Sequence, residues 1–141
     1  MSLSSPLRVL LVEDSINDTF LVVRELERGG LEVEFERVET AQYMEAALEQ
    51  KTWDLVIFDC GVSQLDGVKA LEIYRRKQLE IPLILISGLA KEGQALEMLK
   101  CGAHDYVPKD NLARLAPAVR RELQNAEQRQ LGRKAGEPAM G

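Results

Sequence analysis

The stretch that decides the fold is Asp54-Leu-Val-Ile-Phe-Asp59-Cys-Gly-Val-Ser-Gln-Leu-Asp66-Gly67, DLVIFDCGVSQLDG in one-letter code. Its four consecutive apolar residues, 55–58, are typical of a parallel strand that is buried on both faces. The apolar run ends at Asp59, and a loop with a glycine and a second aspartate follows. An aspartate in this position can be a nucleophile for phosphoryl transfer, a phosphate-accepting switch, or only a capping residue at a strand end.

Short apolar runs alternate with longer amphipathic segments on both sides of this stretch. The predicted strands are Leu7–Val12, Val33–Val38, Leu55–Phe58, Leu83–Ile86 and Asp105–Val107. The predicted helices are Ile16–Arg28, Thr40–Gln50, Gly67–Lys77 (with Asp66 as its cap) and Lys91–Lys100, then a short turn at 111–115 and a last helix from near Pro117 to about Gln130. This alternation predicts an α/β fold, a doubly wound parallel sheet with helices on both faces.

Length and composition indicate one domain and exclude several classes of protein. The chain has 141 residues, of which 45% are hydrophobic, enough for a single core. Residues 1–110 carry 12 Lys and Arg against 20 Asp and Glu, and this acidic body argues against a nucleic-acid-binding surface. No apolar run approaches the about 18 residues of a membrane span. The first residues lack the basic segment of a secretion signal, so we expect a cytoplasmic protein with Cys60 and Cys101 as free, buried thiols.

Polar side chains follow the carboxyl ends of the predicted strands. Glu13 and Asp14 follow the first strand, Asp59 the third, Ser87 the fourth and Lys109 the fifth. In a doubly wound sheet these ends meet at one edge, where ligands bind. Two carboxylates 4 Å apart repel by roughly 4 kcal/mol at an effective dielectric constant of about 20, so three of them need cations. Mg²⁺ suits such an all-oxygen site, with Asp59 as the acceptor of a phosphoryl group that Lys109 and the Ser87 hydroxyl also hold.

The order of these motifs resembles the receiver domain of two-component response regulators over residues 7–127. The motifs are the acidic pair Glu13-Asp14, the acceptor Asp59, Asp66-Gly67 seven residues later, Ser87 after an apolar strand, and Tyr106-Val-Pro-Lys109. The resemblance implies a CheY-like, flavodoxin-like sheet of five strands in the order 2-1-3-4-5. It also implies that a histidine kinase or a histidine phosphotransfer protein phosphorylates Asp59.

The same resemblance implies a ligand set and a switch. The ligands of Mg²⁺ are Glu13, Asp14, Asp59 and the backbone carbonyl of Gly61. In the switch, Ser87 moves toward the phosphoryl group and Tyr106 changes rotamer. Such a domain is a signalling unit and not an enzyme, beyond Mg²⁺-dependent self-phosphorylation from small donors and self-dephosphorylation.

The end of the chain resembles receivers that are fused to sensor-kinase or cyclic-dinucleotide output modules. This second resemblance covers residues 109–123. Helix-favouring composition continues past Glu127, so residues 128–141 are interpreted as a helical overhang and a flexible tail or linker. We expect this segment to contact an output domain, in cis or in trans, and to support at most a weak homodimer.

Three positions depart from the family pattern. Val62-Ser63 stands where Met-Pro is usual, Asp110 replaces the proline after Lys109, and the bulky Leu89 lies two residues after Ser87. The alternative function is a pseudo-receiver, a protein-interaction module of the same fold that is never phosphorylated. Haloacid-dehalogenase phosphatases also carry Phe-Asp at a strand end, but Gly61 stands where that family has its second aspartate.

Overall fold

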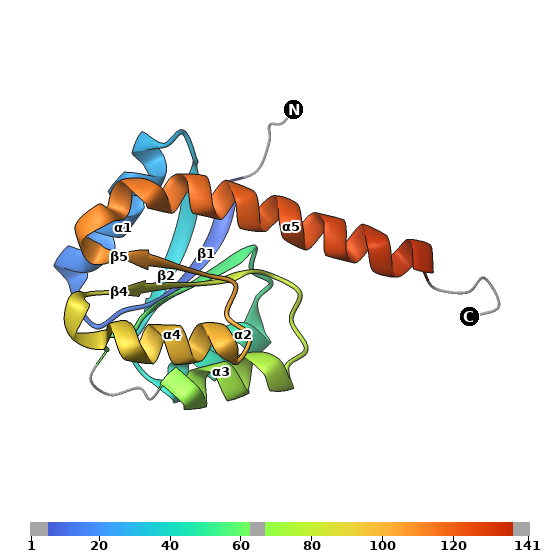
Figure 1. Ribbon diagram of the computed structural model, residues 1–141, viewed down its shortest axis with the longest axis horizontal. Helices are drawn as coiled ribbons and strands as arrows, with labels where there is room; N and C mark the ends of the chain where they lie inside the picture. The colour runs from blue at the N-terminus through green and yellow to red at the C-terminus, as the bar shows by residue number, and fades with distance from the viewer. Residues whose placement is uncertain (1–5, 63–66, 137–141) are drawn as a thin grey trace.

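A five-stranded parallel sheet lies between two layers of helices (Figure 1). The computed structural model describes residues 6–62 and 67–136, with side chains described as far as Gly132. The strands are β1 (Leu7–Val12), β2 (Val33–Val38), β3 (Leu55–Asp59), β4 (Leu83–Ser87) and β5 (Asp105–Pro108). Their order is β2-β1-β3-β4-β5, and every neighbouring pair is parallel. The predicted α/β doubly wound sheet and its strand order are confirmed.

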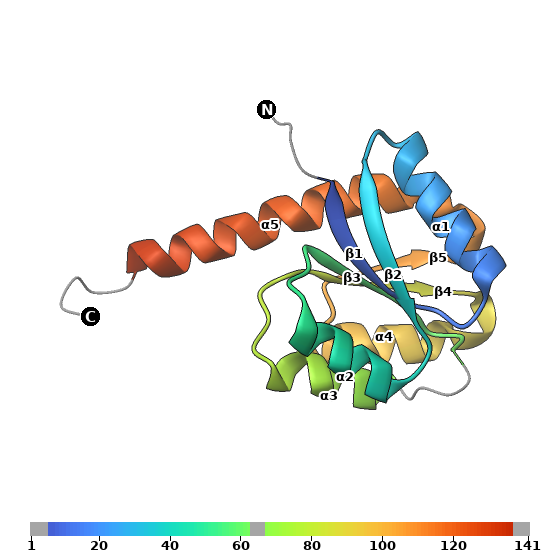
Figure 2. The ribbon, with the colours of Figure 1, turned by 180° about the vertical axis from the view of Figure 1, so that it is seen from behind.

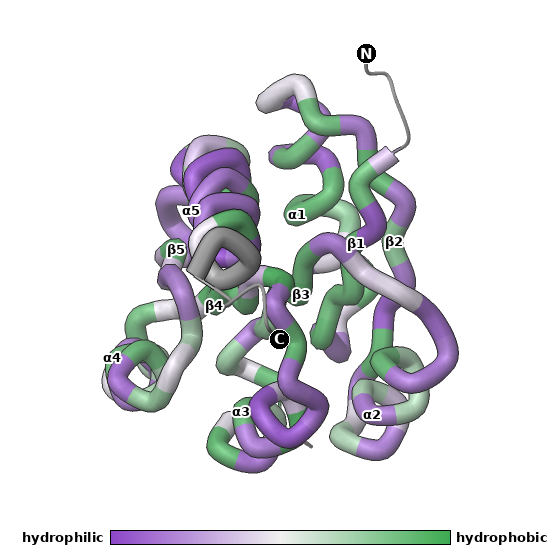
Figure 3. Tube along the Cα trace, turned by 90° about the vertical axis from the view of Figure 1, so that its right-hand side faces the viewer, coloured by the Kyte–Doolittle hydropathy of each residue, from purple (hydrophilic) through white to green (hydrophobic). Residues whose placement is uncertain are grey.

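The helices divide between the two faces of the sheet (Figures 2 and 3). One face carries α1 (Ile16–Arg28) and α5 (Leu115–Gly136), and the other carries α2 (Ala41–Gln50), α3 (Gly67–Arg76) and α4 (Glu92–Lys100). Two 3-10 segments, η1 (Leu89–Lys91) and η2 (Lys109–Arg114), precede α4 and α5. The predicted cap Asp66 and the loop residue Ser63 lie outside the described residues.

The apolar strands supply two cores because successive side chains of a strand point to opposite faces. Val9 and Leu11 of β1 pack with α1 and α5, whereas Leu10 and Val12 pack on the side of α2, α3 and α4. All residues of β3 and β4 are buried, as the continuous apolar runs predicted. Polar side chains on these two strands are therefore confined to the carboxyl ends.

Hydroxyl side chains fix the starts of two helices. Ser15 Oγ accepts a hydrogen bond from Asp18 N at 3.1 Å, and Thr40 Oγ1 accepts one from Tyr43 N at 3.1 Å. Both residues are extended N-caps, so α1 and α2 begin at the residues that follow them. The last helix begins at Leu115, two residues before Pro117, which lies in the first turn, where proline breaks no helical hydrogen bond.

Helix α5 extends beyond the sheet (Figures 1 and 2). Its last buried described side chain is Ala126, and the side chains of residues 127–132 are exposed. The helix continues to Gly136, further than the predicted end near Gln130. Over the described residues, no helix combines the length and apolar character that a membrane span requires.

The prediction for the cysteines is partly wrong. Both are free thiols, and Cys60 is buried as expected. Cys101 is exposed because it is the C-cap residue of α4, beyond the buried face of that helix. No disulfide joins them.

Shortening α5 tests where its packing ends. A chain that ends after Gln130 keeps every buried side chain described on α5, so its free energy of unfolding should stay within about 0.5 kcal/mol of the full chain. A chain that ends after Leu123 loses buried Ala126, and we expect a loss of about 1 kcal/mol or more. Urea unfolding followed by the fluorescence of Trp53, the single tryptophan, measures both. Equal stability of the two shortened chains would contradict this packing.

Candidate functional site

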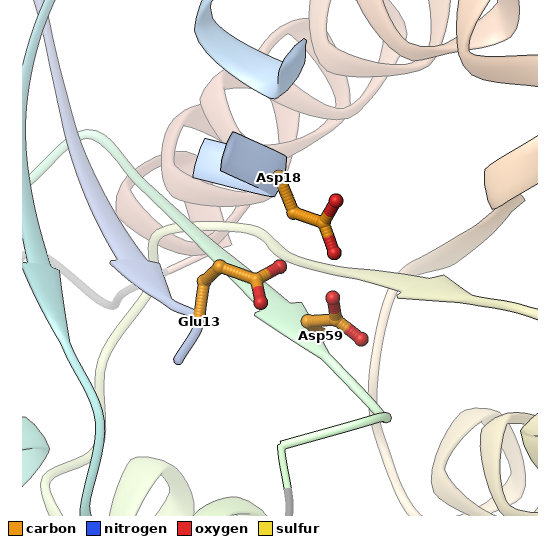
Figure 4. Close-up of side chains that lie close together, drawn as sticks. All are labelled: Glu13, Asp18 and Asp59. Atoms are coloured by element: carbon orange, nitrogen blue, oxygen red, sulfur yellow. The ribbon is translucent and has the colours of Figure 1, made fainter. Parts of the chain in front are cut away.

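Three carboxylates converge at the carboxyl edge of the sheet (Figure 4). Glu13 follows β1, Asp59 ends β3, and Asp18 belongs to the first turn of α1. One carboxylate oxygen from each residue lies within 4.8 Å of the other two. Glu13 and Asp59 are buried, with 4% and 2% of their surface exposed, and Asp18 is half-buried. Such a group needs positive charge or protons close by.

Asp59 is held by the backbone of the following turn. Gly61 N donates a hydrogen bond to Asp59 Oδ1 at 2.7 Å. A Cβ atom at position 61 would lie 3.1 Å from the same oxygen, so glycine permits this close approach. Asp59 Oδ2 is buried and accepts no hydrogen bond of regular geometry from the described residues, although Lys109 Nζ lies 2.7 Å away. This oxygen is the one buried polar side-chain atom without such a bond in the described part of the chain.

Glu13 is fixed by three polar contacts. Its backbone N–H donates to Val38 O at 3.0 Å, and Arg37 Nη1 donates to its carbonyl at 3.2 Å. Its Oε2 accepts a hydrogen bond from Ser15 N at 3.1 Å. Burial, followed by a carboxyl hydrogen bond with Asp59 and the charge of Asp59, raises the pKa of Glu13 to about 9. This raised pKa favours the protonated form of Glu13 in the metal-free protein.

Lys109 supplies the positive charge of the site. It follows Pro108, which pairs with Ser87 across β4 and β5, so its side chain starts at the same sheet edge. Lys109 Nζ contacts both Asp59 Oδ2, at 2.7 Å, and Asp18 Oδ2, at 3.3 Å. Burial acts to lower the pKa of Lys109, but the adjacent carboxylate of Asp59, followed by those of Glu13 and Asp18, outweighs it and raises that pKa.

Ser87 and Tyr106 lie on the other side of Lys109. All three residues line one cavity of about 340 Å³. The buried Ser87 hydroxyl donates to Gly88 O at 2.8 Å, and Tyr106 OH donates to Glu92 Oε2 at 3.4 Å on the protein surface. The Ser87 hydroxyl thus bonds to the neighbouring backbone, and the predicted switch remains a prediction.

Two of the predicted metal ligands gather and one lies apart. Glu13 and Asp59 belong to the three-carboxylate group, whereas Asp14 is exposed and outside it. The sequence prediction missed Asp18. A signal for it exists, because Ser15 as N-cap places the third following residue in the first turn of α1, next to the strand ends. The ligand roles of Asp14 and of the Gly61 carbonyl remain predictions.

Comparison with known protein families identifies the family of this chain. Residues 9–120 match the family model described as response regulator receiver domain. The chain belongs to this family. The predicted membership in the receiver domains of two-component signalling is thereby confirmed.

Relatives of this receiver domain are longer proteins. It is 34% identical over 127 residues to protein-glutamate methylesterase/protein-glutamine glutaminase of Archaeoglobus fulgidus, covering 85% of this chain and 36% of the relative. It is 33% identical over 119 residues to the regulatory protein AtoC of Escherichia coli, covering 83% of this chain and 25% of the relative. The chain thus spans about a third or less of these two curated relatives.

A solved receiver domain has the same fold. It belongs to the sensor histidine kinase PA1611 of Pseudomonas aeruginosa PAO1, with a magnesium ion coordinated in the active site cleft. The TM-score is 0.72 at 24% sequence identity, and the match covers 85% of this chain and 99% of that domain.

The donor set of this receiver domain fits a hard divalent cation. The group consists only of carboxylate oxygens, which Mg²⁺ prefers over nitrogen or sulfur. The buried Asp59 Oδ2, which lacks a regular hydrogen bond, provides an acceptor that a cation can satisfy. A bound cation also favours the ionised form of Glu13.

The raised pKa of Glu13 predicts that the free energy of unfolding of the metal-free protein depends on pH. Between the pKa of an unfolded glutamate, about 4.3, and the folded value of about 9, the unfolded chain releases a proton that the folded chain keeps. Stability should therefore fall as pH rises through this range. In EDTA at pH 7, Glu13→Gln should raise the free energy of unfolding by roughly 1–3 kcal/mol, and the gain should vanish near pH 4.

Urea unfolding at both pH values measures this gain. Glu34→Gln is the matched control, because it removes the same formal charge from an exposed position on β2. A Glu13→Gln variant that is less stable than the wild type at pH 7 would contradict the raised pKa.

Proposed function

We propose that Asp59 accepts a phosphoryl group from a histidine kinase or a histidine phosphotransfer protein. The observation that carries this proposal is the buried Asp59 carboxylate, which keeps Oδ2 free of a regular hydrogen bond while Lys109 Nζ lies 2.7 Å away. A carboxylate that only capped a strand end would use its oxygens on backbone N–H groups. Membership in the receiver family supports the same role.

The proposed transfer exchanges one bond for another. An Asp59 carboxylate oxygen forms a bond to phosphorus, while the bond from phosphorus to the imidazole nitrogen of the donor breaks and that nitrogen keeps the electron pair. Negative charge accumulates on the phosphoryl oxygens, and the ammonium of Lys109 stabilises it. The Ser87 hydroxyl, now bonded to Gly88 O, is proposed to turn to the phosphoryl group.

Mg²⁺ is the proposed cofactor. Glu13, Asp14, Asp59 and the Gly61 carbonyl would hold it, and when bound it would neutralise charge on the transferring phosphoryl group. For Asp14 this requires its exposed side chain to turn toward the pair of Glu13 and Asp59.

The proposed output acts through the surface beside Lys109 and through α5. Movement of Ser87 and a rotamer change of Tyr106 would alter the cavity that both residues line. Residues 7–127 form the proposed receiver domain, and 128–141 the proposed connection to an output domain, in cis or in trans, inside the cytoplasm. The greater length of the relatives supports a fused output. If the chain shortened after Gln130 still controls its output normally, this connection is wrong.

Phosphorylation of Asp59 is directly testable. With Mg²⁺ and acetyl phosphate, the wild-type chain should gain one phosphoryl group, and Asp59→Asn should gain none because its amide is a poor nucleophile. Intact-mass measurement and a phosphate-affinity gel detect the product.

Cys60→Ser is a matched control, since it changes the adjacent buried residue and leaves the carboxylate in place. Labelling of Asp59→Asn at the wild-type level would reject Asp59 as the acceptor. Failure of the wild type to react with acetyl phosphate and with phosphohistidine donors would favour the pseudo-receiver.

Mg²⁺ should stabilise the folded chain, because only folding gathers its ligands. At ten times its dissociation constant the increase in the free energy of unfolding is about 1.4 kcal/mol. Asp14→Asn should abolish this increment, because it removes one of the proposed ligands. Thermal unfolding with and without Mg²⁺ measures it, with Glu34→Gln as the control. A full Mg²⁺ increment in Asp14→Asn would place the ion elsewhere.

A further inference from the structure

Asp18 is the carboxylate that the predicted Mg²⁺ ligands do not include. It lies in the first turn of α1, and its backbone N–H donates to the N-cap hydroxyl of Ser15 at 3.1 Å. Its side chain points toward Glu13 and Asp59 (Figure 4). Asp18 Oδ2 accepts a hydrogen bond from Lys109 Nζ at 3.3 Å. The helix start therefore places a negative charge beside the phosphorylation pocket.

The single ammonium group of Lys109 contacts two carboxylates. Asp59 Oδ2 lies at 2.7 Å and Asp18 Oδ2 at 3.3 Å, and the two carboxylates come from different elements. The Asp59 side chain is 3% exposed, whereas those of Asp18 and Lys109 are 39% and 35% exposed. Lys109 thus joins a half-exposed carboxylate on one side to a buried one on the other.

A phosphoryl group on Asp59 makes this sharing unfavourable. The phosphoryl oxygens of an acyl phosphate on Asp59 carry negative charge, and charge-assisted hydrogen bonds to a cation stabilise them. An ammonium that also bonds to Asp18 is less available for those oxygens. The charge of Asp18 itself repels a second anion at the distances of this pocket.

We propose that Asp18 is a positioning residue that shares the Lys109 ammonium with Asp59. This sharing lowers the affinity of the pocket for a phosphoryl group. This inference rests on the function proposed above. It gives Asp18 a role in setting how readily the phosphorylated state forms, separate from the ligand and acceptor roles of Glu13 and Asp59.

A simpler role for Asp18 has a different signature. An acidic residue in the first turn stabilises a helix through its N-terminal dipole, and this effect needs no partner on η2. Half-exposed ion pairs contribute little to stability, so loss of stability alone does not separate the two roles. The separation requires a measurement that depends on Lys109 or on the bound phosphoryl mimic.

Beryllofluoride, which mimics the phosphoryl group, is the probe for the test. At saturating Mg²⁺, ¹⁹F NMR titration should show Asp18→Asn binding it about two- to fivefold more tightly than the wild type, the range of a half-exposed ion pair. Asp18→Glu should bind it nearly as the wild type does. Glu25→Gln is the matched control, because it removes an acid from α1 whose partner is Arg28, at 3.4 Å, and should leave the affinity unchanged. Equal or weaker binding by Asp18→Asn overturns the proposal.

A double-mutant cycle in EDTA tests the link through Lys109. The shifts in urea midpoint of Asp18→Asn and Lys109→Gln should not add in the double variant, because each change removes the same contact. Additive shifts would assign Asp18 to the helix dipole and overturn the proposal. A loss of Mg²⁺ affinity of tenfold or more in Asp18→Asn would overturn it too, by making Asp18 a metal ligand.

The outcomes also separate this inference from the proposed function. If the wild-type chain binds no beryllofluoride in the presence of Mg²⁺, both the proposed function and the role of Asp18 are wrong. A wild-type chain that binds it while Asp18→Asn binds no more tightly removes only the role of Asp18.

Discussion

The charge of Asp59 at the end of a fully buried strand is the constraint to which the rest of the site responds. A carboxylate removed from water is costly unless hydrogen bonds, a cation or another compensating group stabilise it. Gly61 contributes one hydrogen bond and Lys109 one positive charge. Glu13 responds in the opposite way, since its raised pKa keeps it neutral beside Asp59. The pocket thus tolerates its acidic residues by neutralising one of them and pairing the others.

The sheet assembles this pocket from parts of the chain that are far apart in sequence. Parallel strands that are apolar on both faces leave no place for polar groups except at their ends. Helices then cover both faces (Figure 3), so the polar side chains meet at the carboxyl edge, where Asp59 lies next to both Glu13 and Lys109. The same packing that buries Val9 and Leu11 therefore also positions the polar side chains.

The sequence predicted those features that depend on local pattern. Continuous apolar runs identified β3 and β4, and the amphipathic pattern predicted the helix Ile16–Arg28 with the bounds that α1 has. Glu13, Asp59 and Lys109 were found because each lies directly after a strand.

Two kinds of feature could not be predicted from local pattern: the direction in which a side chain points, and the end of a helix whose last described side chains are exposed. Asp18 belongs to the pocket because the first turn of α1 directs its side chain there, and a search limited to strand ends does not include helix positions. Asp14 is next to Glu13 in sequence but lies on the exposed side of the turn. The predicted end of α5 differs from the observed one because residues 127–132 are exposed, so no buried face guides the prediction of where the helix ends.

The length of α5 beyond Ala126, its last buried side chain among those described, gives it the properties of a lever. Gly136 lies ten positions after Ala126, a helical extension of about 15 Å. A tilt of about 10° at the base of such an extension moves its end by about 3 Å, although the packed part of the helix shifts by much less. A small rearrangement near Leu115, at the sheet edge that holds Lys109, can thus become a displacement comparable to an atomic contact distance at the far end of the helix.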